Sequence, residues 1–303
     1  MVLFLAAGPS APGQEAVSAV NQARLFVTPS TPGLSSNDST ETASNENTST
    51  NSGDESFGTQ IILKNQERPK TLSAFGEVSS FYTNNVDLRP NNTRSDVFVV
   101  STAGAAWRPI ISHDLLGEIS SAASVFNYDK ARGLDFERIS AGGGLTWIIP
   151  GTPGIAAFGR YDFTEVINSD GSELLQDHAF TLGAQKTFVF GRSHSLTTGI
   201  TATGGISAPK SQEREQAGLN ASYHLQITQS LGADLLYRYA AQFYVENSRV
   251  DNNQTMSLIL GVAATRWLRI QGTLSAARND SNRSGFRYEA INSGGGLQGN
   301  IKF

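Results

Sequence analysis

Beyond Pro69, apolar residues alternate with polar or small residues in segments of about 10 to 14 residues. A period of two is the pattern of a β-strand whose two faces meet different surroundings. Gly, Pro, Asn, Asp and Ser separate the segments, as they do at turns. The pattern therefore predicts about twelve strands, over residues 71–84, 95–107, 114–127, 135–148, 155–167, 175–189, 195–207, 213–227, 231–246, 253–265, 268–279 and 286–303.

The connections between these segments alternate in kind. RPIISH, PGTPG, FGRSH, TQS and the break at Arg266 are short, whereas NNVDLRPNNTRS, YDKARG, NSDGSE, SAPKSQ, ENSRVDNN and NDSNRS are polar and mostly rich in Asn, Asp and Ser. Every proline after Pro69 lies in a connection, where it interrupts no strand hydrogen bond. Short turns at one end and polar loops at the other predict an all-β, closed antiparallel up-and-down barrel. In transmembrane barrels the short turns face the periplasm, so both termini are expected there.

The two faces of the strands favour a barrel in a membrane over one in water. The face predicted to contact lipid carries Leu219, Tyr223, Leu235, Tyr237, Leu258 and Leu260. The opposite face is polar, and a polar interior with an apolar exterior is typical of transmembrane barrels. A β-sandwich or a soluble lipocalin-like barrel, which would bury the apolar face, remains as an alternative. The charged residues expected to face the lumen are Arg138, Arg160, Asp162, Asp234, Arg238 and Arg269.

These lumen charges have two interpretations. They set the charge of a narrow channel, or they form a ladder of salt bridges that fills a barrel without a continuous pore. Aromatic residues near the strand ends are expected to form two girdles at the membrane interfaces. These are Tyr82, Trp107, Phe126, Trp147, Phe163, Phe188, Tyr244, Trp267 and Phe286.

The last predicted strand, 286–303, places Leu297, Ile301 and Phe303 on one face. An alternating final strand that ends in Phe resembles the C-terminal signal of outer-membrane barrels, which implies recognition by the barrel-assembly machinery. Phe286, Tyr288 and Ala290 fall on the opposite phase. We therefore expect a β-bulge near residues 293–296, which would bring both groups to one face.

Composition narrows the alternatives further. The absence of Cys excludes disulfides, thiolate metal sites and a lipoprotein anchor. No run approaches the roughly 18 apolar residues of a spanning helix, so a membrane crossing is expected to use strands. Residues 1–63 contain six acids and one base, a net charge of −5, which leaves +1 for residues 64–303 of a chain with a net charge of −4. Neither part has the basic face that nucleic-acid binding requires.

The N-terminal region differs from the rest of the chain. Residues 1–14 include the apolar run VLFLAAG and are interpreted as the remnant of a signal peptide. Residues 15–69 are mostly acidic and rich in Ser, Thr and Asn, which predicts disorder. Within them, 57–64 (FGTQIILK) is a short apolar segment. It is expected to plug the barrel, to dock through 57–68 onto a periplasmic or subunit partner, or to be plain linker.

Several stretches, FGTQIILK, FGEVSSFYTNNV, LDFERISAGGGLTW, AAFGRYDF, TRWLRI and the final GGGLQGNIKF, resemble uncharacterised outer-membrane β-barrel proteins of the porin superfamily, of the putative β-barrel porin type. The resemblance covers roughly residues 57–303. It implies contact with outer-membrane lipid in a Gram-negative-type bacterium and carries over no catalytic or binding residue.

A search for chemistry yields little. An outer-membrane hydrolase would need His, Ser and Asn or Gln grouped on the lipid-facing surface, but the four His residues are scattered and no nucleophile motif occurs. No spacing predicts a metal site, and the glycine runs lack the strand-to-helix context of a phosphate loop. We therefore expect no enzyme, cofactor or metal. The favoured function is a narrow passive channel for small polar solutes; a structural or docking component of the envelope is the alternative, and a hydrolase a minor one.

Overall fold

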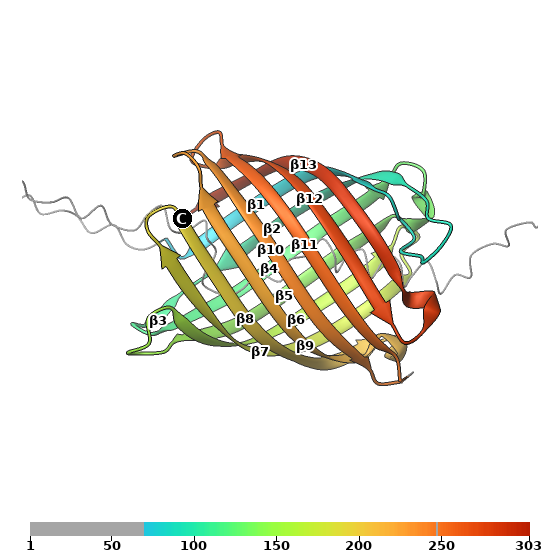
Figure 1. Ribbon diagram of the computed structural model, residues 1–303, viewed down its shortest axis with the longest axis horizontal. Coiled ribbons are helices and arrows are strands. Elements are labelled where there is room, and N and C mark those ends of the chain that lie inside the picture. The colour runs from blue at the N-terminus through green and yellow to red at the C-terminus, as the bar shows by residue number, and fades with distance from the viewer. Residues whose placement is uncertain (1–69, 247) are drawn as a thin grey trace, which may run out of the picture.

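The computed structural model describes residues 70–246 and 248–303, so the predicted segments 1–14 and 15–69 lie outside the described residues. The described chain forms one antiparallel sheet that closes into a barrel (Figure 1). Its long strands each pair with the next one along the chain, and the last strand, β13, pairs back onto the first, β1. The predicted fold, a closed barrel of twelve long strands, is confirmed.

The strand bounds match the predicted segments closely. The long strands are β1 (Leu72–Thr83), β2 (Asp96–Trp107), β4 (Leu115–Tyr128), β5 (Phe136–Ile148), β6 (Ile155–Asn168), β7 (Glu173–Phe190), β8 (His194–Ala208), β9 (Arg214–Gln226), β10 (Leu231–Tyr244), β11 (Val250–Ala263), β12 (Leu268–Ser281) and β13 (Tyr288–Lys302). The one addition is β3 (Ile110–Ser112), a short strand in the turn between β2 and β4. Three-residue 3₁₀ helices occupy three connections: η2 (Arg132–Leu134), η3 (Lys210–Gln212) and η4 (Ser284–Phe286). Within the described residues, no helix is long and apolar enough to cross a membrane.

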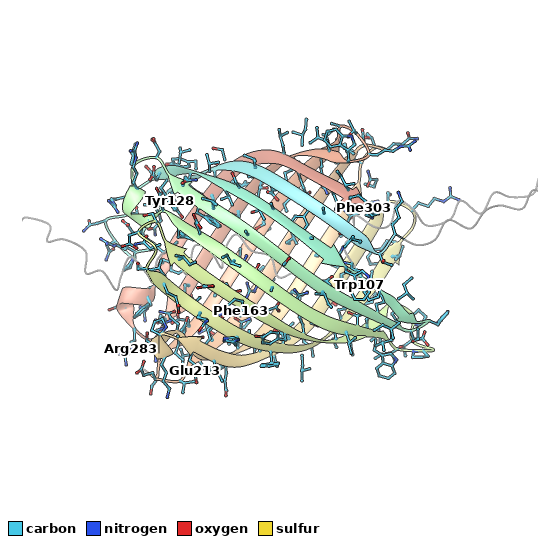
Figure 2. The ribbon with its side chains drawn as sticks, turned by 180° about the vertical axis from the view of Figure 1, so that it is seen from behind. Trp107, Tyr128, Phe163, Glu213, Arg283 and Phe303 are labelled. Carbon is cyan, nitrogen blue, oxygen red and sulfur yellow. The ribbon has the colours of Figure 1, made fainter. Side chains whose placement is uncertain are left out.

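The barrel has a short-turn end and a loop end. Figure 2 shows Trp107 and Phe303 at one end, and Tyr128, Glu213 and Arg283 at the other. The first is the short-turn end, because β2 and β13 finish there. Glycines make its tightest turns possible: Gly154 has a φ of 74°, and a side chain there would strike the backbone oxygen of Thr187. By the rule for transmembrane barrels, the short-turn end faces the periplasm.

The exterior of the barrel is apolar. Five of the six predicted lipid-facing side chains are exposed, with exposed fractions of 52% for Leu219, 37% for Leu235, 42% for Tyr237, 39% for Leu258 and 48% for Leu260. The sixth, Tyr223, is half-buried beside His194, whose Nδ1 lies 2.6 Å from the tyrosine hydroxyl. A closed barrel with this exterior spans a membrane, since water would not tolerate so large an apolar surface. The structure therefore excludes the β-sandwich and the soluble barrel.

The predicted bulge in the last strand does not occur. Its pairing with β12 runs without a register shift from Tyr288, opposite Asn279, to Gly299, opposite Leu268. Tyr288 and Ala290 consequently face the interior, where they are 6% and 2% exposed. The prediction was wrong because it assumed that every apolar side chain of this strand meets lipid.

The interior of the loop end is an apolar core instead. Inward side chains of six strands and connections pack there, centred on Phe98, Phe126, Phe136 and Val166, each at most 1% exposed. The rings of Phe126 and Phe136 stack with their centroids 4.3 Å apart. This apolar core covers the part of the loop end formed by β1 to β7, whereas charged and hydroxyl-bearing side chains line the middle of the barrel.

Candidate functional site in the barrel lumen

The structure places all six predicted lumen charges on the inward face. Ile139 and Tyr237 are each 42% exposed on the outside, so their neighbours Arg138 and Arg238 point inward, because successive side chains of a strand alternate. By the same alternation along their own strands, Arg160, Asp162, Asp234 and Arg269 also point inward. So do four charged residues that the sequence analysis did not single out, although the same alternation identifies them: Glu77, Glu118, Asp177 and Arg214.

One cluster of lumen charges lies on β4 and β6. The guanidinium of Arg160 donates from Nη1 to Glu118 Oε1 and from Nε to Asp162 Oδ1, both at 2.6 Å, and from Nη2 to Ser120 Oγ at 3.2 Å. Arg108, in the turn after β2, donates to the other oxygen of Glu118 at 2.8 Å. The Glu118 side chain is only 3% exposed, whereas that of Asp162 is 35% exposed. Two arginines thus neutralise two acids, and one of the acids still meets solvent.

A second cluster lies on β9, β10 and β12. Asp234 Oδ1 is 2.6 Å from Nδ1 of His224, and its Oδ2 accepts a hydrogen bond from Arg269 Nη2 at 3.3 Å. A side chain at Gly261 would collide with the Arg269 guanidinium, so the absence of a Cβ there lets the arginine lie flat against the wall. Asp234 is therefore held in place by one partner on the adjacent strand β9 and by another on β12, two strands away.

Arg138 and Arg238 are different, because neither forms an ion pair or a hydrogen bond with any described residue. Arg138 on β5 lies in register with Ser124 and Val166. Arg238 on β10 lies in register with Asn220 and Thr255. Asp162 lies close enough to attract Arg138 without bonding to it, and Arg214 is a like-charged neighbour of Arg238. Both arginines are partly exposed to the lumen.

Hydroxyl groups line the wall between the two clusters. Thr181 on β7 and Thr203 on β8 lie with their Oγ1 atoms 2.9 Å apart, and Thr187 and Thr197 repeat this arrangement at the same distance. Each pair bridges adjacent strands on the inward face. This part of the lumen is polar but uncharged.

The loop between β1 and β2, residues 84–95, folds into the loop end of the lumen. Val86 is 0% exposed and belongs to the apolar core, while Leu88, 5% exposed, packs on Tyr288 and Ala290 of β13. Leu88 adopts a left-handed backbone with a φ of 49°, which costs about 1 kcal/mol and is held by its burial. Asp87 and Arg94 close the loop with paired contacts of 2.6 and 2.7 Å. The loop therefore narrows the outer mouth.

The predicted interfacial aromatics divide into two groups. Tyr82, Trp107, Trp147, Phe188 and Trp267 are exposed on the outside, and Phe163 lies half-buried on the same face beside the ring of His178. Phe126 and Tyr244, 1% and 4% exposed, do not belong to a girdle, because their phase points inward. Tyr244 and Phe286 instead flank the guanidinium of Arg249, whose Cζ lies 3.4 and 4.0 Å from the two ring centroids. An aromatic residue near a strand end therefore joins the interfacial girdle only if its side chain points outward.

The His residues do not assemble a hydrolase site. His113 pairs with Asp114, His178 with Tyr161, His194 with Tyr223 and His224 with Asp234. None of these pairs includes a serine. In the part of the chain that the structure describes, no three His, Cys, Asp or Glu side chains are arranged to hold a metal ion.

No protein-family model matches the sequence. A search of curated proteins gives no match either. Among solved structures, an outer-membrane channel from Pseudomonas putida F1 covers 80% of this chain and all of its own, with a TM-score of 0.53 and 7% identity. The β-domain of the Bordetella autotransporter BrkA (TM-score 0.46, 9% identity, 76% of this chain and 100% of its own) and the translocator domain of the autotransporter NalP from Neisseria meningitidis (0.43, 9%, 77% and 90%) are also similar.

At these identities the comparisons show the fold alone. Of these three structures, the Pseudomonas channel has a TM-score high enough to carry that argument. The resemblance inferred from the sequence is confirmed at this level. Together with the apolar exterior, it shows a β-barrel that spans a membrane. The chain has the fold of a porin-type outer-membrane barrel.

Proposed function

We propose that this chain is a narrow passive channel for small polar solutes. The observation that supports this most directly is that charged side chains of the lumen meet solvent from inside the barrel. The exposed fractions are 35% for the Asp162 side chain, 20% for that of Arg269 and 10% for that of Arg160. A barrel filled by salt bridges alone would bury these groups.

The size of the barrel favours a small solute. Barrels of about eight strands are filled by side chains and those of about sixteen are open, so twelve strands leave a limited lumen. Large inward rings reduce it further. Phe75 packs over Gly104 and Phe158 over Gly183, and a Cβ at either glycine would overlap the ring. Loop 84–95 narrows the outer mouth.

The alternative of a docking component depends on residues 57–68, which lie outside the described residues. The solvent-exposed charges of the described lumen favour the channel.

Single-channel recording in planar bilayers tests the proposal. We expect small, steady current steps, and a variant with an inward tryptophan, Thr201→Trp, should reduce their size. The matched control is Ile200→Trp, because Ile200 precedes Thr201 on β8 and is 59% exposed on the outside. A folded wild-type barrel that passes no current, or equal conductance of the two variants, would contradict the proposal.

A further inference from the structure

Five arginines face the lumen from the described strands, and they fall into two groups. Three have carboxylate partners: Arg160 pairs with Glu118 and Asp162, Arg269 lies 3.3 Å from Asp234, and Arg214 lies 3.9 Å from Asp177. Arg138 and Arg238 have no acceptor of any kind among the described residues. Both residues are half-buried on the inward face of the barrel wall.

Inward acids without a cation are treated differently by the fold. Glu77 accepts hydrogen bonds from Ser79 Oγ at 2.7 Å and Gln271 Nε2 at 3.0 Å. Asp96, 3% exposed at the loop end, accepts from the backbone N–H groups of Val97, Lys130 and Ala131. These donors spread the charge of each carboxylate. Arg138 and Arg238 have no such hydrogen-bond partners among the described residues. Asp162, already paired with Arg160, attracts Arg138 only from a distance, and Arg238 is repelled by Arg214. These two positive charges are therefore the ones that a solute can neutralise.

The two arginines stand on nearly opposite walls. Going round the sheet from β5 to β10 takes five steps through β6, β7, β8 and β9, and seven steps in the other direction through β4, β2, β1, β13, β12 and β11. A solute that passes along the lumen therefore comes between them. Asn220 lies beside Arg238 in the same row and can offer an additional neutral donor, whereas the hydroxyls of Ser124 and Thr255 are engaged by Thr102 and Asn253.

A guanidinium stays charged at any working pH and presents a planar fork of N–H donors that matches the oxygens of carboxylates and phosphates. In a narrow lumen with low-dielectric walls, an uncompensated charge is costly and its field is focused along the solute path. A counter-ion from solution removes that cost. The counter-ion that suits these guanidinium groups is a small anion whose oxygen atoms accept their hydrogen bonds.

We propose that Arg138 and Arg238 form an anion-selective element, which makes the lumen prefer small oxyanions such as carboxylates and phosphates over cations. This inference rests on the proposed channel. It names the class of solute that the channel takes.

The test is the reversal potential of the full-length protein in a planar bilayer under a potassium chloride gradient. We expect wild type to prefer chloride over potassium several-fold, and the double variant Arg138→Gln, Arg238→Gln to lose most of that preference. Arg278→Gln is the matched control, because Arg278 lies on the outward phase of β12 with a side chain 57% exposed. The inference fails if wild type prefers potassium or neither ion, or if the double variant keeps the wild-type preference.

A second set of variants separates charge from shape. Arg138→Lys with Arg238→Lys keeps the positive charge but removes the planar fork, so it should keep the chloride preference. It should require a several-fold higher citrate concentration than wild type to block the current. Equal block of wild type and the lysine variant would leave selectivity to charge alone and would overturn the oxyanion preference.

A silent barrel would defeat the proposed function, and anion binding has its own readout for that case. Citrate should raise the thermal midpoint of the folded wild-type barrel in detergent and leave that of the double glutamine variant unchanged. Binding without current would retain the anion site in a protein that is not a channel. No current and no citrate shift would overturn both proposals.

Discussion

The side-chain amide of Asn85 donates a hydrogen bond to the backbone carbonyl oxygen of Glu289, 2.9 Å away and 204 positions along the chain. The same amide donates to the carbonyl oxygen of Arg89 at 2.8 Å, and the Asn85 side-chain oxygen accepts from the Arg89 backbone N–H at 3.0 Å. One side chain, 0% exposed, therefore closes loop 84–95 on itself and ties it to the last strand. The position of this loop at the outer mouth depends on that residue.

We expect Asn85→Ala to loosen loop 84–95. The substitution removes three hydrogen bonds and leaves buried backbone groups without partners, which costs on the order of 2 kcal/mol. Trypsin reports the change, because the bond after Arg94 is cleavable whereas Arg89 precedes Pro90. Cleavage of the folded variant after Arg94 should be faster than in wild type, and its conductance should be larger.

Asn91→Ala is the control for this experiment, since Asn91 lies in the same loop with an exposed side chain. It should be cleaved at the wild-type rate. If Asn85→Ala and Asn91→Ala behave alike, the hydrogen bonds of Asn85 do not hold the loop.

The second prediction concerns Glu118, which accepts hydrogen bonds from both Arg108 and Arg160. Glu118→Gln leaves two positive charges without their shared partner. We expect a loss of about 2 kcal/mol in the free energy of unfolding, less than for a fully buried ion pair, because the Arg108 side chain is 39% exposed. Urea titration of the folded barrel in lipid vesicles measures it. The exterior change Glu137→Gln should cost under about 0.5 kcal/mol, and an equal cost for both would refute the prediction.

The third prediction compares neighbouring residues of β11. Leu258 is 39% exposed on the lipid side, and Ser257 faces the lumen. Leu258→Arg should destabilise the barrel by roughly 2–4 kcal/mol, because it places a charge in the hydrocarbon layer. Ser257→Arg should cost clearly less, since water reaches the lumen. Refolding titrations that show equal costs would mean that the two faces are assigned incorrectly.

The fourth prediction is that the barrel folds without residues 1–68. Its closure needs only pairs between β1, which begins at Leu72, and β13. A chain that begins at Pro69 should therefore refold with wild-type stability. If residues 57–64 plug the lumen, the deletion raises the conductance; if they dock onto a partner, it leaves the conductance alone and abolishes co-purification of that partner. A barrel that fails to refold would contradict the prediction.

Much of this architecture follows from the sequence alone. Leu258 and Ser257 illustrate the reason: the side-chain period of a strand is two, so one apolar neighbour is enough to assign a phase. The same alternation assigns Arg138 and Arg238 to the inward face without knowledge of the strand pairing. The alternation of short turns and polar loops was sufficient to predict the order of the strands, because neighbours in an up-and-down barrel are neighbours in sequence.

The tertiary structure decided what those inward residues meet. Arg160 reaches Glu118, 42 positions away, and Arg269 reaches Asp234, 35 positions away, because the stagger between strands brings those rows together. The alternation within a single strand carries no information about that stagger. It therefore could not tell the paired arginines from Arg138 and Arg238.

The apolar core at the loop end was also decided by the tertiary structure. Val86 and Leu88 lie in a stretch that reads as a solvated loop, and Tyr244 lies near a strand end where an interfacial aromatic is expected. Val86 and Leu88 are buried because loop 84–95 folds back into the barrel, and Tyr244 is buried because its side chain points inward and Arg249 covers its ring. Sequence alternation determines which side of the wall a residue occupies, but burial inside the lumen depends on how far the loops enter it.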